Sequence, residues 1–168
     1  MQVYDESTMR RAIARMRLNW SRELAFSSRQ INYLNAAIPQ GRGIYAVYAK
    51  DHLFPYDSPD WPTQRWSSRV YLGSGWIGQR LCRHLARREN DVLSGYIDNF
   101  RLACRYAFVT DSDEDWPKVA EASLLRLFVD QYDNLPPANR RRESIYDFGL
   151  HVLHVDESEN FRFIARGW

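Results

Sequence analysis

The chain has 168 residues and a net charge of +2, a balance that by itself indicates neither a nucleic acid nor an acidic partner. The sequence contains no run of about 18 uninterrupted apolar residues, which excludes a membrane-spanning helix of the usual kind. The N-terminus lacks the apolar stretch of a secretory signal, so we expect a single-domain cytoplasmic protein. Of the 23 basic residues, 21 are arginine. This excess fits phosphate recognition, and equally a genome rich in G and C.

Two helices and a strand are expected in the first part of the chain. Residues 5–26 carry apolar side chains at helical spacing, and a weaker helical pattern covers 28–37. The first predicted strand covers 43–49, behind two glycines. Residues 50–68 contain three prolines with several Asp and Ser, so we expect a long loop there, either covering the sheet or reaching toward a substrate.

The remaining pattern alternates between strands and helices. The expected elements are a strand at 69–73 broken by Gly73 and Gly75, helices at 76–89 and 91–100, a strand at 101–110, a helix at 116–132, and a hairpin of strands 150–155 and 161–165. This order predicts an α+β fold with a small, mostly antiparallel sheet flanked by helices. We expect an N-terminal helical extension at 1–40, a core at 41–140 and a C-terminal extension at 141–168.

The two cysteines stand alone in the sequence. Cys82 and Cys104 form no CxxC motif and have no histidine at metal-binding spacing. We therefore expect both to be reduced residues of the core.

The predicted helix at 76–89 carries two different faces. Ile77, Leu81 and Leu85 recur every four residues and should form its buried stripe. A second face gathers the charged side chains Arg80, Arg83, His84 and Arg87. Like charges at this spacing repel, and a phosphate would relieve the repulsion. A solvated helix face with acidic partners from elsewhere explains the same pattern.

A carboxylate lies in line with the apolar stripe of the next long helix. Leu124, Leu125, Phe128 and Tyr132 form this stripe, and its extension by one turn toward the N-terminus reaches Glu121. A carboxylate on a core face is costly to bury unless it is paired or binds a cation. A salt bridge with one of the many arginines is the simpler explanation. Taken singly, Tyr45 and Tyr71 fit ordinary core residues and Asn139 fits a turn cap.

In their order along the chain, these residues resemble the motifs of the GIY-YIG nuclease family. The first motif is Gly43-Ile44-Tyr45 and the second is Tyr71-Leu72-Gly73. An arginine followed four residues later by a histidine, a helix with a glutamate and a closing asparagine complete the pattern as Arg80, His84, Glu121 and Asn139. The spacer after Gly73 is one residue short, so the family arginine is Arg80 or Arg83, and the interval to His84 favours Arg80. The layout also resembles the restriction-endonuclease branch.

The resemblance implies a metal-dependent DNA endonuclease that leaves 5′-phosphate and 3′-hydroxyl ends. It implies Mg²⁺ (or Mn²⁺) held by Glu121, Arg80 on the scissile phosphate, Tyr45 and Tyr71 on the attacking water, His84 in proton transfer and Asn139 as a brace. Further phosphate contacts are expected from Arg83, Arg87, Arg140 and Arg141. A solvated loop explains Arg140 and Arg141 equally well. A homodimer would supply the two cuts that a duplex needs. A repair or structure-specific nuclease, and a non-catalytic nucleic-acid-binding module on the same fold, remain alternatives.

Overall fold

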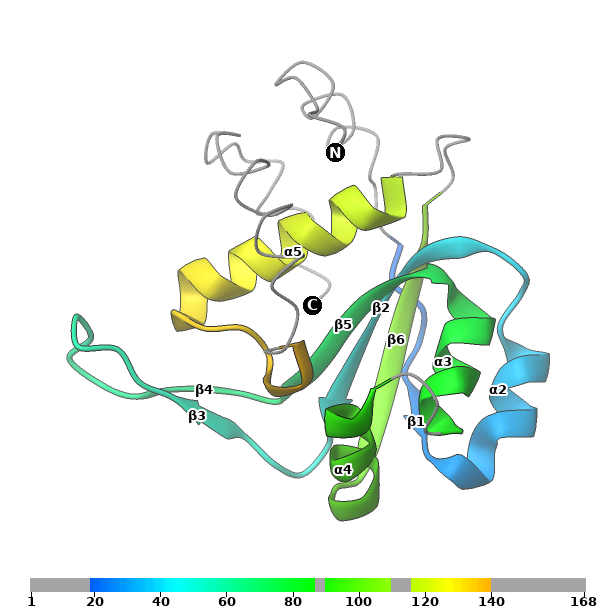
Figure 1. Ribbon diagram of the computed structural model, residues 1–168, viewed down its shortest axis with the longest axis horizontal. Coiled ribbons are helices and arrows are strands. Elements are labelled where there is room, and N and C mark those ends of the chain that lie inside the picture. Colours follow the sequence, from blue (N-terminus) through cyan, green and yellow to red (C-terminus); the bar gives the residue numbers. More distant parts are fainter. Residues whose placement is uncertain (1–18, 87–89, 110–115, 140–168) are drawn as a thin grey trace.

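The computed structural model describes residues 19–86, 90–109 and 116–139, and it has an α+β fold (Figure 1). The elements in chain order are β1 (Leu24–Phe26), the 3₁₀ helix η1 (Ser28–Gln30), α2 (Ile31–Ala37), β2 (Arg42–Ala49), β3 (Phe54–Tyr56), β4 (Arg65–Ser67), β5 (Arg69–Trp76), α3 (Ile77–Leu85), α4 (Asp91–Asn99), β6 (Leu102–Phe108), α5 (Trp116–Tyr132) and the 3₁₀ helix η2 (Pro137–Asn139).

The main sheet has four strands in the order β1-β6-β2-β5, and every neighbouring pair is antiparallel. The predicted α+β class and antiparallel sheet are therefore confirmed for the described residues. Strand β2 is central and pairs over almost its full length with β5 and β6. Since both of its faces are covered, its residues from Gly43 to Val47 are all buried, which explains why GIYAV reads as a continuous apolar run.

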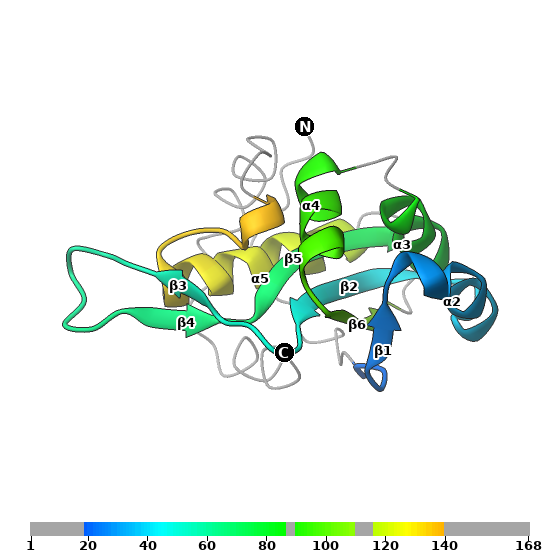
Figure 2. The same cartoon turned by 90° about the horizontal axis from the view of Figure 1, so that it is seen from below.

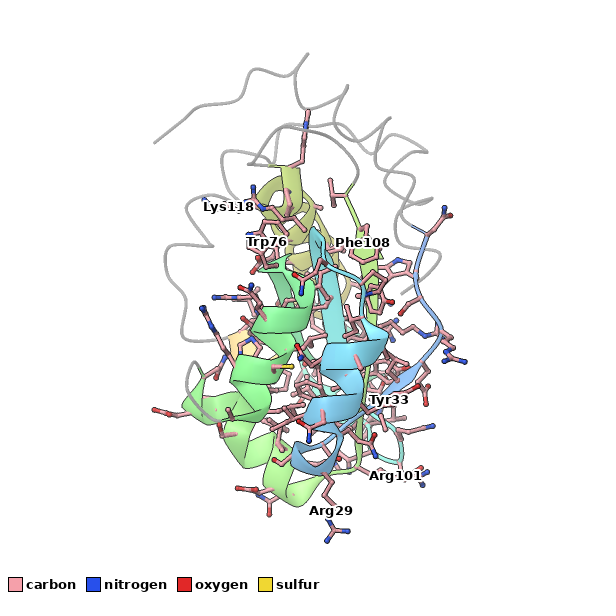
Figure 3. All side chains as sticks on the ribbon, turned by 90° about the vertical axis from the view of Figure 1, so that its right-hand side faces the viewer. Arg29, Tyr33, Trp76, Arg101, Phe108 and Lys118 are labelled. Carbon is pink, nitrogen blue, oxygen red and sulfur yellow. The ribbon has the colours of Figure 1, made fainter. Side chains whose placement is uncertain are left out.

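Helices cover both faces of this sheet. Helix α5 lies on one face, and α2, α3 and α4 lie on the other (Figures 1 and 2). Figure 3 shows α2 and α3 side by side. The predicted buried stripe of α3 is confirmed, because Ile77, Leu81 and Leu85 all belong to the core. Strand β5 forms one edge of the sheet and leads directly into α3, which places its last residues beside the start of that helix.

Two sequence-based expectations about the strands were wrong. Residues 24–26 form strand β1 and not the end of a helix, because Leu24 and Phe26 alternate with exposed Ala25 and the segment pairs with β6. Long-range pairing here overrides the local helical spacing. The second predicted strand also continues past Gly73 and Gly75 to Trp76, because both glycines stay in register with β2.

The expected loop at 50–68 contains a small β-hairpin of its own. Strands β3 and β4 pair only with each other and project from the body of the molecule (Figures 1 and 2). Tyr56 anchors the hairpin by packing against Phe128 and Tyr132 of α5. The two tryptophans of this segment differ, because Trp66 is 50% exposed whereas Trp61 is partly buried and packs against the core.

Several expectations fall outside the described residues. These are the helix over 5–18, the hairpin at 150–155 and 161–165, and the arginines Arg87, Arg140 and Arg141. No helix in the described ranges combines the length and apolarity needed to cross a membrane. Cys82 and Cys104 are both free, as expected. Cys104 is a fully buried core residue, whereas Cys82 is only partly buried, so the expectation that it belongs to the core was wrong.

Candidate functional site

Tyr45 is the centre of a buried polar cluster on the face of the sheet that α3 covers. Its hydroxyl lies 2.8 Å from Nε2 of His84 in a buried hydrogen bond. The ring of Tyr71 lies 6.1 Å from that of Tyr45 and 5.0 Å from the imidazole, between centroids. Tyr45 and Tyr71 have no exposed surface, and His84 has 1%. Three of the residues predicted from the motifs therefore meet in one place.

The position of His84 corrects one expectation. The sequence placed it with the arginines on a charged face of the helix, yet it lies inside, next to Leu85 in the stripe that faces the sheet. A buried imidazole needs a polar partner, and the Tyr45 hydroxyl supplies it. Arg83 is exposed and His84 is buried, so these two side chains do not share one face of the helix.

Gly73 provides the room that this cluster needs. Gly73 stands opposite Tyr45 on the neighbouring strand. A Cβ atom at Gly73 would lie 2.5 Å from Oη of Tyr45 and 2.9 Å from Cε1 of Tyr71. The phenol thus occupies the space over the glycine. Because the backbone of Gly73 stays in the regular strand register, this position needs a glycine for the space above it and not for an unusual backbone conformation.

Arg80 reaches the cluster from the start of α3. Its side chain passes Gly75, where a Cβ atom would lie 3.5 Å from Cγ of Arg80. Gly75 has a φ of +121°, a conformation that other residues rarely adopt, and it marks the turn of the chain from β5 into α3. The guanidinium of Arg80 lowers the pKa of the Tyr45 phenol, against the larger effect of burial, so its charge acts on that side chain. Of the two arginines that fit the family spacing, Arg80 is therefore the one beside Tyr45, whereas Arg83 is exposed.

Glu121 approaches from the opposite face of the sheet. It lies on α5 in line with Leu124, Leu125 and Phe128, and it is 8% exposed. The hydroxyl of Ser74, on edge strand β5, donates a hydrogen bond to Oε2 of Glu121 at 2.5 Å. Ser74 stands opposite Ile44, so its side chain lies on the α5 face, whereas Tyr45 lies on the α3 face. The site therefore gathers side chains around both faces of one edge strand.

The charges around Tyr45 act on its pKa in opposite directions. Burial raises the pKa of the Tyr45 phenol well above its usual value, and Tyr71 and the charge of Glu121 raise it further. The guanidinium of Arg80 lowers it through its charge and its hydrogen bond. The raising contributions dominate, so Tyr45 is a neutral phenol at neutral pH. The influence of Glu121 also shows that its carboxylate lies within electrostatic reach of the phenol.

Asn139 fastens η2 to the edge strand. Its side-chain amide accepts a hydrogen bond from Leu72 N at 2.9 Å and donates one to Leu72 O at 2.8 Å. Leu72 lies between Tyr71 and Gly73, so this pair of bonds holds the second motif in place. Asn139 itself is fully buried.

The donors present suit a hydrated magnesium ion better than a zinc site. No group of three or more His, Cys, Asp or Glu side chains converges in the described part of the chain. Zinc sites use three or four such ligands, whereas Mg²⁺ keeps several waters and often takes one or two carboxylates with substrate phosphates. Glu121, a buried carboxylate that accepts a hydrogen bond from the partly exposed Ser74, fits the second arrangement.

The structure thus brings the six predicted catalytic residues around β5 and leaves Arg83 outside this cluster. Sequence reasoning missed Ser74 as the hydrogen-bond donor to Glu121. Strand alternation could have indicated it, because Ser74 in the GSG sequence lies on the face opposite Tyr45. No family model, no curated protein and no solved structure matches this chain.

Proposed function

We propose that this protein is a metal-dependent DNA endonuclease of the GIY-YIG type, which hydrolyses phosphodiester bonds to 5′-phosphate and 3′-hydroxyl ends and acts in restriction. One observation carries the proposal. Four side chains from three separate elements, His84, Tyr71, Arg80 and Glu121, act on the hydroxyl of Tyr45 through contact or charge. A hydroxyl that is hydrogen-bonded to an imidazole and influenced by the charges of an arginine and a carboxylate suits the transfer of a proton beside a bound phosphate.

The exposed part of the site indicates where the phosphate would bind. Ser74, Gly75 and Arg80 are partly exposed, whereas the two phenols and His84 lie behind them. Arg80 is a fixed cation at this opening and would stabilise the charge on the scissile phosphate. Glu121 would hold the ion, with Ser74 fixing the orientation of its carboxylate. The bound Mg²⁺ would neutralise charge on the phosphate and on the leaving oxygen.

The buried phenols would act on protons through hydrogen bonds and not as phenolates. The Tyr45 hydroxyl is hydrogen-bonded to Nε2 of His84, so the phenol could pass its proton to the imidazole as it takes up one from the attacking water, and it would remain neutral. Since the pKa of Tyr45 is raised, its hydroxyl keeps a proton to donate near neutral pH. Asn139 would keep the strand that carries Tyr71 in register.

The burial of the phenols also favours a second candidate function. Attack on phosphorus requires water to reach the reacting group, and neither phenol has exposed surface. A nucleic-acid-binding module that uses the partly exposed Arg80 without catalysis would need no such access. The two functions differ in whether any strand is cut.

The test is an incubation of supercoiled and linear DNA with Mg²⁺ or Mn²⁺. We expect cutting by the wild type, and a rate at least about 10²-fold lower for Glu121→Gln and Arg80→Ala, which remove one ligand and one transition-state donor. Arg29→Ala is the matched control, because Arg29 is exposed at the far end of the molecule (Figure 3). Discrete fragments would support restriction, and a preference for flaps or junctions would support repair.

Two outcomes would contradict the proposal. Equal cutting by the wild type and both site variants would place the active site elsewhere. Binding of DNA without cutting in either metal would support the non-catalytic module.

A further inference from the structure

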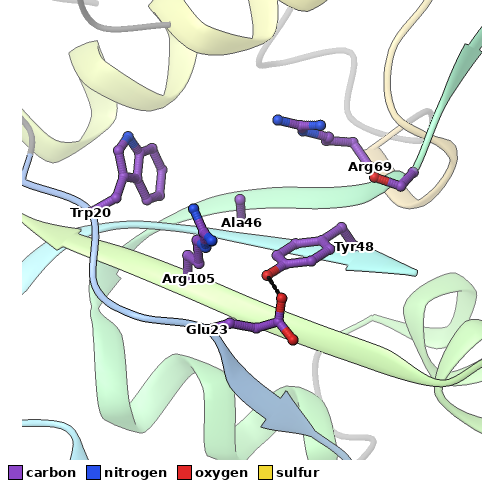
Figure 4. A pocket seen from close by; sticks show the side chains of 7 residues that line it. Trp20, Glu23, Ala46, Tyr48, Arg69 and Arg105 are labelled. Carbon is purple, nitrogen blue, oxygen red and sulfur yellow. Dashed lines mark hydrogen bonds between the residues drawn. The ribbon is translucent and has the colours of Figure 1, made fainter. Parts of the chain in front are cut away.

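A second pocket lies on the α5 face of the sheet, in a part that the motifs do not reach. It has a volume of about 190 Å³ and is lined by Trp20, Glu23, Ala46, Tyr48, Ser68, Arg69 and Arg105 (Figure 4). Ala46 alternates with Tyr45 along β2, so the pocket and the Tyr45 cluster lie on opposite faces. The volume is below the ~300–1,000 Å³ of pockets that enclose a drug-sized ligand. It suits one compact polar group.

A break in strand register turns one arginine into this pocket. Strands β2 and β5 pair regularly as far as Val47 and Tyr71, but Tyr48 then faces Arg69 and not Val70. Val70 is therefore an extra residue in β5, which makes a β-bulge at this point. The bulge places Arg69 on the face of the sheet on which Tyr48 lies. Bulges of this kind often redirect a side chain next to a functional site. Figure 4 shows the guanidinium of Arg69 extending from β5 toward the space above Ala46.

A second arginine enters the pocket from the other neighbouring strand. Arg105 stands opposite Ala46 on β6, and Figure 4 shows it beside Trp20 on the other side of the space from Arg69. Burial lowers the pKa of Arg69, and the charge of Arg105 adds a smaller effect in the same direction. Two cations that disfavour each other in a partly desolvated pocket gain stability from a shared anion.

Two buried donors in the same wall lack acceptors. Nε of Arg105 and Nε1 of Trp20 are both buried, and neither has a hydrogen-bond partner within the described ranges. A buried donor without an acceptor is costly, and an oxygen-rich ligand or ordered water usually satisfies it. Trp20 also contributes an aromatic surface to the pocket wall.

The acidic residue of the pocket does not cancel these charges. The carboxylate of Glu23 forms a salt bridge with Lys50 and accepts a hydrogen bond from Tyr48 at 2.6 Å. The charge of Arg105 also acts on this carboxylate, so Glu23 is one acidic residue shared between Lys50 and Arg105. The pocket combines two cations, two donors and an aromatic wall.

We propose that this pocket binds a phosphate group, either of a nucleic acid strand or of a small phosphate ester. The planar, forked donors of arginine match the oxygens of phosphate, and the volume admits one such group. The nucleic-acid source rests on the proposed function, whereas phosphate binding by the pocket does not.

The first experiment uses the indole N–H of Trp20 as a reporter. Inorganic phosphate and dimethyl phosphate are titrated into the full-length protein, and the indole resonance, assigned with Trp20→Phe, is followed by NMR. We expect a saturable shift, with affinity at least about 10-fold weaker in Arg69→Gln and in Arg105→Gln, the loss of one charge-assisted contact. Arg29→Gln is the charge-matched control and should leave the affinity unchanged. Thermal unfolding of each variant shows that the variant is folded.

The second experiment distinguishes the two sources. Binding of duplex DNA is measured at several salt concentrations in the uncleaving Glu121→Gln background. If the phosphate belongs to DNA, Arg105→Gln lowers the slope of log affinity against log salt by about 0.9, the value for one phosphate contact. An unchanged slope assigns the pocket to a small phosphate ester.

The outcome that overturns the inference is separate from failure of the nuclease proposal. A phosphate-induced shift no larger than that of chloride at equal ionic strength, or equal shifts in both arginine variants and the wild type, would refute the phosphate site. Saturable phosphate binding in a protein that neither binds nor cuts DNA would leave this site standing and refute the proposed nuclease.

Discussion

Substitution of Gly73 by alanine tests how the Tyr45 cluster is packed. The added Cβ would lie 2.5 Å from Oη of Tyr45, 2.6 Å from its Cζ and 2.9 Å from Cε1 of Tyr71. Two of these are atoms of buried rings, which cannot rotate away without displacing their neighbours. Overpacking of this kind costs about 1–3 kcal/mol. The backbone adds no strain, because Gly73 lies in a regular strand.

Two other glycines provide matched controls for this substitution. A Cβ at Gly78 in α3 would lie 3.9 Å from its nearest neighbours, in ordinary contact, and one at Gly95 in α4 would meet nothing within 4 Å. Alanine in a helix is favoured over glycine by about 0.5–1 kcal/mol, so both controls should be stabilised. The expected difference between Gly73→Ala and the controls is therefore at least about 1.5 kcal/mol, or about 3–6 °C in Tm for a chain of this size.

The assay is thermal and urea unfolding of the three variants in one buffer. A double variant, Gly73→Ala with Tyr45→Phe, separates the contact with the hydroxyl from the contact with the ring. The two changes should be non-additive by more than about 0.5 kcal/mol, because the residues touch. A Tm for Gly73→Ala equal to that of wild type or of Gly95→Ala would show that Tyr45 does not occupy the space over Gly73.

Two further predictions concern the edge strand and the second pocket. Asn139→Ala removes both bonds to Leu72, and since each unsatisfied buried group costs about 1–3 kcal/mol, we expect a loss of at least about 2 kcal/mol in urea unfolding. Exposed Asn35→Ala is its control, and equal stability of the two variants would contradict the bonding. Lys50 and Tyr48 lower the pKa of Glu23 below its ordinary 4.5. A lowered carboxyl pKa stabilises the fold above pH 4.5, and this contribution is lost as the pH falls further. The Tm gap between wild type and Lys50→Met should therefore narrow from pH 7 to pH 3, and a constant gap would refute the coupling.

The elements that could be predicted from the sequence are those with a regular local spacing of apolar residues. Helices α3, α4 and α5 and strands β2 and β6 follow from apolar spacing and turn residues, and the burial of Glu121 follows from its alignment with Leu124 and Phe128. Motif order was enough to select the residues that the fold brings around Tyr45. These features depend on residues a few positions apart in the sequence, or on the order of the motifs that resemble the nuclease family.

The features that sequence reasoning missed depend on long-range pairing. Strand β1 exists because β6 lies beside it, and its three residues carry too little periodicity to indicate a strand. The bulge that redirects Arg69 is visible only in the register between β2 and β5. His84 was assigned to the charged face because its burial depends on a phenol 39 residues away.

The amide of Asn139 has a consequence beyond the stability of one strand. An edge strand offers its unpaired N–H and C=O groups as a template on which another chain can add, the first step of many aggregates. By bonding to both backbone polar groups of Leu72, Asn139 occupies that template at the end of the apolar run Val70–Leu72. The same side chain that steadies the second motif therefore shields the protein against unwanted self-association.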